Sequence, residues 1–114
     1  MVYTIREEGW KMLNIVLVCS AGMSTSLMVN KMKQSALEKG IEAEIWAVAD
    51  AEAVNQVDKA DILMLGPQVR FLQSKMKKIA KGKPVEVIDM KSYGTMNGAL
   101  VLEQAIAALN KKNE

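Results

Sequence analysis

The sequence contains no histidine and a single cysteine, Cys19, among its 114 residues. Without imidazole the chain can hold no phosphohistidine of its own, no Ser-His triad, no Cys-His protease pair and no ordinary zinc site. One cysteine also cannot form an internal disulfide. Any chemistry must therefore use other side chains or the backbone, and Cys19 is the one thiol available.

The chain also lacks a long apolar run and a strong net charge. No stretch approaches the roughly 20 apolar residues that a bilayer span requires, and the opening segment, MVYTIREEGWK, has acidic side chains where a signal peptide has an apolar core. The formal charge is +2, and the basic residues are not interleaved with aromatic ones. Nucleic acid and anionic lipid are therefore weak candidate partners, and we expect a cytoplasmic protein.

Half of the residues are hydrophobic, which is enough for a chain of 114 residues to bury one core. Short apolar, β-branched runs alternate with segments in which apolar residues have helical spacing. Residues 1–12 precede this pattern and are interpreted as an N-terminal extension, so that residues 13–114 form the domain. We expect strands at residues 13–18, 41–48, 61–65 and 85–88, and helices at residues 25–39, 50–57, 69–79 and from 96 or 97 to 109.

This alternation predicts an α/β fold: a single domain with a four-stranded parallel sheet and helices on both faces. The run LNIVLV at residues 13–18 is apolar almost throughout, as in a strand that is buried on both faces. In such folds ligands bind beyond the carboxyl ends of the strands, where the strand order reverses. Cys19, Gly66 and Asp89 each follow a predicted strand, so we expect all three at this edge.

The segment after Cys19 is small and rich in hydroxyl groups, which suits the binding of an anion. A loop of such residues can curl so that consecutive backbone N–H groups point at one spot. The helix that follows adds its own N–H groups and about half a positive charge. This field favours the thiolate of Cys19 and suggests a covalent phosphocysteine. The predicted phosphate-binding loop comprises Ser20, Ala21, Gly22, Met23, Ser24, Thr25 and Ser26.

A simpler interpretation treats Cys19 as a small buried hydrophobe, as many lone cysteines are. Its position between a strand and a donor-rich loop favours the functional interpretation, because a core cysteine needs no such loop. Three polar residues near the other strand ends are candidates to support the loop: Gln68, Asp89 and Tyr93. Asp89 is also placed to cap the next turn.

Three segments of the sequence resemble one known family. They are VLVCSAGMSTSLMVNKMK, LMLGPQVRF and KPVEVIDMKSYGTMNG. Residues 13–109 are similar to the IIB component of the bacterial phosphoenolpyruvate-dependent sugar phosphotransferase system, in its lactose, cellobiose and chitobiose class. The cysteine followed by Ser-Ala-Gly-Met-Ser-Thr-Ser is a specific part of this match.

The resemblance implies a domain whose cysteine, here Cys19, accepts a phosphoryl group from a phosphohistidine on the IIA component. The group then passes to a disaccharide of the cellobiose, chitobiose or lactose type that the membrane component IIC imports. The resemblance thus implies a cytoplasmic sugar phosphotransferase that associates peripherally with the membrane component. No cofactor or metal is expected.

Two other classes of enzyme share the strand, cysteine loop and helix. Low-molecular-weight tyrosine phosphatases have an arginine six residues after the cysteine, where it clamps the phosphoryl oxygens, whereas this sequence has Thr25 there. No arginine lies between Cys19 and Gly66, which argues against efficient hydrolysis. A thiol-dependent enzyme similar to arsenate reductase would need an external thiol to complete its cycle. A purely structural binding module leaves the cysteine unexplained.

Overall fold

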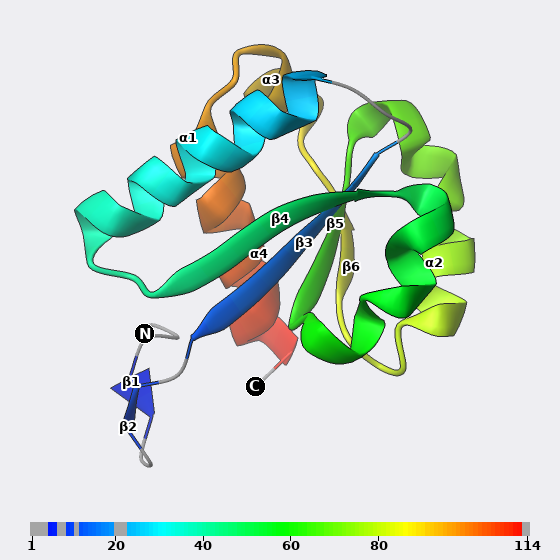
Figure 1. The fold of residues 1–114 in the computed structure, drawn as a ribbon, viewed down its shortest axis with the longest axis horizontal. Helices are drawn as coiled ribbons and strands as arrows, with labels where there is room; N and C mark the ends of the chain where they lie inside the picture. The colour runs from blue at the N-terminus through cyan, green and yellow to red at the C-terminus, as the bar shows by residue number, and fades with distance from the viewer. Residues whose placement is uncertain (1–4, 7–8, 11, 20–22, 113–114) are drawn as a thin grey trace.

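A computed structural model describes residues 5–6, 9–10, 12–19 and 23–112. Four parallel strands form one sheet in the order β4-β3-β5-β6, as Figure 1 shows. Their bounds are β3 (Leu13–Cys19), β4 (Ala43–Ala49), β5 (Ile62–Leu65) and β6 (Val85–Val87). Two short strands that precede them, β1 (Ile5–Arg6) and β2 (Gly9–Trp10), pair antiparallel as a separate sheet.

Helices cover both faces of the four-stranded sheet, which confirms the predicted fold class (Figure 1). One face carries α1 (Met23–Lys39) and α4 (Gly98–Lys112). The other face carries three 3₁₀-helices and one α-helix. These are η1 (Asp50–Asn55), η2 (Val57–Lys59), η3 (Pro67–Leu72) and α2 (Gln73–Ile79), and the short α3 (Met90–Gly94) follows β6.

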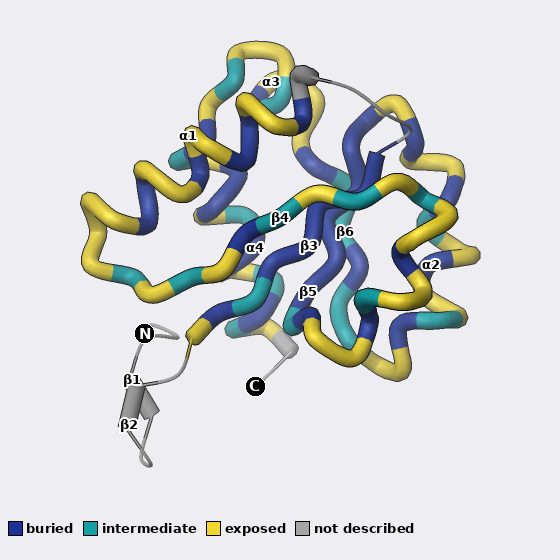
Figure 2. The backbone as a smooth tube through the Cα atoms, viewed as in Figure 1, coloured by how far each residue is buried: buried dark blue, intermediate teal, exposed yellow. Residues whose placement is uncertain are grey.

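The central strand β3 is buried on both sides, as its apolar sequence predicts (Figure 2). Ile15 and Leu17 belong to the core under α1 and α4, while Val16 and Val18 belong to the core on the opposite face. The edge strand β4 is much more exposed, with only Ile45 fully buried, in agreement with its alternation of apolar and acidic residues. The sheet therefore holds the end of β3 at a fixed position between two packed layers.

Besides shifts of one or two residues at the ends of elements, three segments differ in type from the sequence-based expectation. The segment at residues 50–57, which the sequence predicts as a short helix capped by Asp50, forms 3₁₀-helices instead. Asp50 makes no side-chain cap, because Ala49 occupies the N-cap position. The expected helix at residues 69–79 begins as η3, with non-helical dihedral angles at Val69. A 3₁₀-helix aligns residues three apart, which puts Val69 and Leu72 into the same core. The helix α3 was not expected as a separate element.

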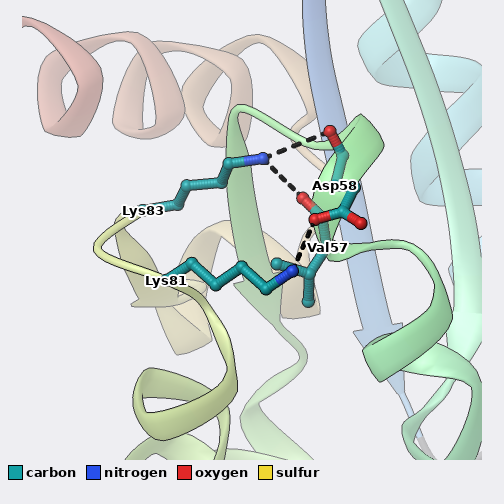
Figure 3. A network of polar contacts seen from close by, with 4 residues as sticks. All are labelled: Val57, Asp58, Lys81 and Lys83. Carbon is teal, nitrogen blue, oxygen red and sulfur yellow. Dashed lines mark hydrogen bonds and ion pairs between the residues drawn. The ribbon is translucent and has the colours of Figure 1, made fainter.

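A polar cluster lies at the end of the sheet where β6 begins (Figure 3). The Lys81 ammonium lies 2.8 Å from the carboxylate of Asp58, and Lys83 donates to the carbonyl oxygens of Val57 and Asp58 at 2.6 and 3.3 Å. Because the strands are parallel, this end lies opposite their carboxyl ends. These two lysines therefore link the turn before β6 to η2, at the end of the sheet opposite Cys19.

Candidate functional site

Cys19 is the last residue of β3, at the carboxyl edge of the sheet. It stands in register with Ala49 of β4, and its Sγ lies 3.9 Å from the carbonyl oxygen of Val48. Only 5% of its surface is exposed. Burial alone is compatible with a core cysteine, so the position of the thiol relative to its neighbours decides what it can do.

The strand order reverses at this position. The chain leaves β3 for β4 on one side and later returns to β5 on the other side of β3. The amide of Gly66, just after β5, donates to the carbonyl oxygen of Val18 at 3.0 Å, so the ends of β3 and β5 are joined. Cys19 therefore lies at the crevice where parallel α/β sheets bind their ligands.

The helix α1 begins two residues earlier than the sequence predicts. Met23, Ser24, Thr25 and Ser26 thus form its first turn and are not loop residues. Ser20, Ala21 and Gly22, which complete the predicted phosphate-binding loop, lie outside the described residues, as do the side chains of Met23 and Ser24. The first turn of α1 contains no acidic residue, so its N–H groups and the helix dipole favour negative charge at this end of the helix.

The structure brings two of the three supporting candidates together with the first turn of α1. The Tyr93 hydroxyl oxygen lies 3.3 Å from Oγ1 of Thr25. The Nε2 of Gln68 donates to the same hydroxyl at 3.4 Å. Thr25 is 2% exposed, although it is polar. These residues follow three different strands of the sheet and meet at one edge.

Asp89 has the capping role that its sequence position allows. Its carboxylate accepts from the backbone N–H of Ser92 at 2.9 Å and from the Ser92 hydroxyl at 3.0 Å. These two hydrogen bonds hold the pKa of the Asp89 carboxyl below its ordinary value. Asp89 therefore starts α3, the helix that carries Tyr93, and contributes to the site through that helix.

Two contacts at this edge were not predicted: the close approach of Gln68 to Gly66, and the bonds of Gln104 to the end of β6. A Cβ at Gly66 would stand 2.6 Å from Oε1 of Gln68, so the absence of a side chain there lets Gln68 fold back. Gln104 of α4 accepts from the backbone N–H of Asp89 at 3.0 Å and donates to the carbonyl oxygen of Val87 at 2.8 Å. The Gly66-Pro67 pair signalled a turn, but nothing in the sequence around Gln104 indicated its contacts with the end of β6.

An open hollow of about 580 Å³ lies elsewhere, between α1 and the start of α4. Its lining includes Lys31 and Asn97 but not Cys19. The geometry of the strand ends, and not the size of this hollow, therefore identifies the candidate site. Among the described residues no helix is both long and apolar enough to span a bilayer.

Known proteins resemble this chain over most of its length. The family model "PTS system, Lactose/Cellobiose specific IIB subunit" matches residues 14–104. The oligo-beta-mannoside-specific EIIB component of Bacillus subtilis is 48% identical over 100 residues, which cover 86% of this chain and 97% of that protein. The galactose-specific EIIB component of Lactococcus lactis subsp. cremoris is 44% identical over 103 residues, 84% of this chain and 95% of the relative.

Solved structures agree with this match. The cellobiose-specific IIB component of Borrelia burgdorferi has a TM-score of 0.76 and 44% identity, over 90% of this chain and 95% of that one. The lactose-specific IIB domain of Streptococcus pneumoniae has a TM-score of 0.77 at 18% identity, over 86% of this chain and 98% of that domain, and shares the fold. The matches favour sugar phosphotransfer over the phosphatase and reductase alternatives. The chain belongs to the lactose/cellobiose-specific IIB family of the sugar phosphotransferase system, whose members work with IIA and IIC partners in sugar uptake.

Proposed function

We propose that Cys19 carries the phosphoryl group as a phosphocysteine, between a phosphohistidine of the IIA component and a sugar at the membrane component IIC. The supporting observation is the position of this thiol at the carboxyl end of β3, just before the amino end of α1. The free N–H groups and dipole of that helix end stabilise negative charge beside the sulfur. The same field receives the oxygens of the transferring phosphoryl group.

In the accepting step, the Cys19 thiolate attacks phosphorus in line with the P–N bond of the phosphohistidine. A P–S bond forms, the P–N bond breaks, and the imidazole nitrogen keeps the bonding electrons. In the donating step, a sugar hydroxyl oxygen attacks the phosphorus, the P–S bond breaks with its electrons left on sulfur, and the proton of the hydroxyl passes to solvent. The thiolate is then restored for the next cycle.

A carrier needs a phosphocysteine that survives until its partner arrives. Thr25 stands where the phosphatases place an arginine, and its neighbour is the neutral hydroxyl of Tyr93. The backbone amides and hydroxyls of residues 20–26 therefore hold the phosphoryl group without a cationic clamp that promotes attack by water. We place the sugar in the class of cellobiose, chitobiose and lactose, with the choice among sugars made at IIC. The protein then acts at the membrane surface, in contact with IIC.

The proposal is tested by reconstituting the transfer chain from phosphoenolpyruvate through the two general phosphotransfer proteins and IIA. Mass analysis of the intact protein and its peptides should find one phosphoryl group, on Cys19. The Cys19→Ser variant should accept none, because a serine alkoxide is far less available than a thiolate. Its thermal unfolding should match that of the wild type, so that loss of labelling reports chemistry.

Normal labelling of Cys19→Ser, or a phosphoryl group on another residue, would remove Cys19 from this role. Turnover of an aryl phosphate by the isolated protein provides a separate check. A carrier should show none above the Cys19→Ser background, whereas steady turnover would support the phosphatase alternative.

A further inference from the structure

The hydroxyl of Tyr93 joins three segments that follow three different strands. Thr25 lies in the first turn of α1, after β3, and Gln68 lies in η3, after β5. Tyr93 lies in α3, after β6, and its hydroxyl lies 3.3 Å from Oγ1 of Thr25 and 3.4 Å from Nε2 of Gln68. The chain segments around the end of β3 are therefore linked through one oxygen atom.

The position of Tyr93 is set by the core packing of its ring and by the anchoring of α3. Its ring packs against the core beneath α1 and α4. The cap made by Asp89 fixes the start of α3, and Gln104 holds the backbone on both sides of Ile88 through Val87 and Asp89. The packing of the ring and the cap of α3 therefore fix the position of the Tyr93 hydroxyl. A group fixed in this way preorganises the groups that it contacts.

Gln68 reaches Tyr93 because Gly66 has no side chain. A Cβ at Gly66 would stand 2.6 Å from Oε1 of Gln68, and the three atoms nearest to that Cβ all belong to the Gln68 side chain. The dihedral angles of Gly66 are −60° and 150°, which any residue adopts. A methyl group at position 66 would therefore displace the carboxamide of Gln68 without straining the backbone.

The three groups also suit a site that must hold a phosphoryl group. An amide and two hydroxyls are neutral, so they bring no negative charge to this edge. The contact between the hydroxyls of Thr25 and Tyr93 links the first turn of α1, whose free N–H groups suit an anion, to the packed helix α3. An error of about 1 Å in such a position is enough to slow a transfer strongly.

We propose that Tyr93 is a positioning residue for phosphoryl transfer: its hydroxyl holds Thr25 and Gln68 so that the first turn of α1 is preorganised beside Cys19. This proposal rests on the proposed role of Cys19. Its test compares Tyr93→Phe with the wild type in transfer from phosphorylated IIA. The variant keeps the ring and loses the hydroxyl.

The transfer rate at saturating IIA should fall about three- to tenfold in Tyr93→Phe, as expected for a lost hydrogen bond. The KM for IIA should stay unchanged, because docking is not altered. Gly66→Ala and Gln68→Leu should each slow transfer in the same way. Neither should slow it further in the Tyr93→Phe background, because all three changes break the same link.

Thr95→Val is the matched control, since it removes a hydroxyl at the end of the same helix. The Thr95 hydroxyl donates to the carbonyl oxygens of Lys91 and Ser92, and in the described part of the chain no hydrogen bond joins it to Thr25 or Gln68. This variant should transfer at the wild-type rate. Unchanged transfer in Tyr93→Phe, a change in KM alone, or full additivity with Gly66→Ala would each overturn the proposal.

The two proposals fail in different ways. If the role of Cys19 is wrong, the wild-type protein carries no phosphoryl group on Cys19, whatever residue stands at position 93. If only the role of Tyr93 is wrong, Cys19 is labelled normally and Tyr93→Phe transfers as fast as the wild type. A loss of activity that follows the melting temperature of the variants would also count against positioning.

Discussion

Gly98, the first residue of α4, packs directly against the backbone of Lys31 in α1. A Cβ at Gly98 would stand 2.5 Å from the carbonyl carbon of Lys31 and 2.7 Å from its carbonyl oxygen. Contacts this short are with backbone, which cannot rotate away. The two helices of this layer therefore cross as closely as they do because residue 98 has no side chain, and α1 is the helix that follows Cys19 in the chain.

Gly98→Ala should therefore destabilise the protein, by about 1–3 kcal/mol, because the added methyl group forces α4 away from α1. Helix propensity alone predicts the opposite, since alanine is the better helix former. Gly94→Ala is the matched control, because a Cβ at Gly94 meets no atom within 4 Å. It should be neutral or slightly stabilising. Urea unfolding of both variants measures the difference, and equal effects would contradict this account of the helix crossing.

Two neighbouring residues of α1 should respond very differently to truncation. Met28 is fully buried in the core under α1 and α4, whereas Leu27 is 46% exposed. Met28→Ala should lower the free energy of unfolding by about 2–5 kcal/mol through lost burial and a cavity. Leu27→Ala should change it by no more than about 0.5 kcal/mol. Leucine and methionine have similar helix propensities, so chemical denaturation compares burial alone. A larger effect at Leu27 would show that α1 is rotated from its described orientation.

The cap of α3 should make part of the stability depend on pH. The hydrogen bonds from Ser92 lower the pKa of Asp89 in the folded protein, so its contribution is complete above the unfolded pKa of about 3.9. That contribution is lost as the pH falls through the lowered folded value. Asp89→Asn should keep the cap, since asparagine caps as well as aspartate, but lose this pH dependence. Between neutral pH and about pH 3, the free energy of unfolding measured by chemical denaturation should fall further for the wild type than for Asp89→Asn. Equal losses of stability in the wild type and in Asp89→Asn would contradict the assignment of this pH dependence to Asp89.

The pKa of Asp58 should depend on Lys81 more than on Lys83. The hydrogen bond from Lys81 is the main cause of the lowered pKa of Asp58, and Lys83 donates to backbone carbonyl oxygens instead (Figure 3). In Lys81→Met the Asp58 pKa should rise towards its ordinary value, and in Lys83→Met it should rise less. NMR titration of the carboxyl carbon measures both. Added salt should weaken the effect in the wild type, because the pair is exposed. Equal rises of the Asp58 pKa in the two variants would show that the positive charge of either lysine lowers it, and not the specific hydrogen bond from Lys81.

The strands of the sheet could be predicted because their pattern is local. The run at residues 13–18 is apolar almost throughout, and only a strand between two layers needs such a sequence. The segment at residues 41–48 begins with alternating apolar and acidic residues, a pattern that favours a half-exposed strand, and β4 is such a strand. The end of the first helix at residue 39 was predicted from a local signal as well. Gly40 follows it with φ of +72°, which glycine adopts freely. Where prediction failed, as at Asp50 and Val69, the choice between 3₁₀ and α geometry depended on packing against the sheet.

The sequence by itself determined the fold class, the place of Cys19 at the carboxyl end of the first strand of the parallel sheet, and the family, because each depends on residues that are close together in the chain. Only the tertiary structure decided that Thr25, Gln68 and Tyr93 share one hydrogen-bonded cluster. Tyr93 is 68 residues from Thr25 and 25 from Gln68. Their distance in space is set by strand order and by the packing of α1 against α4, which no local pattern encodes.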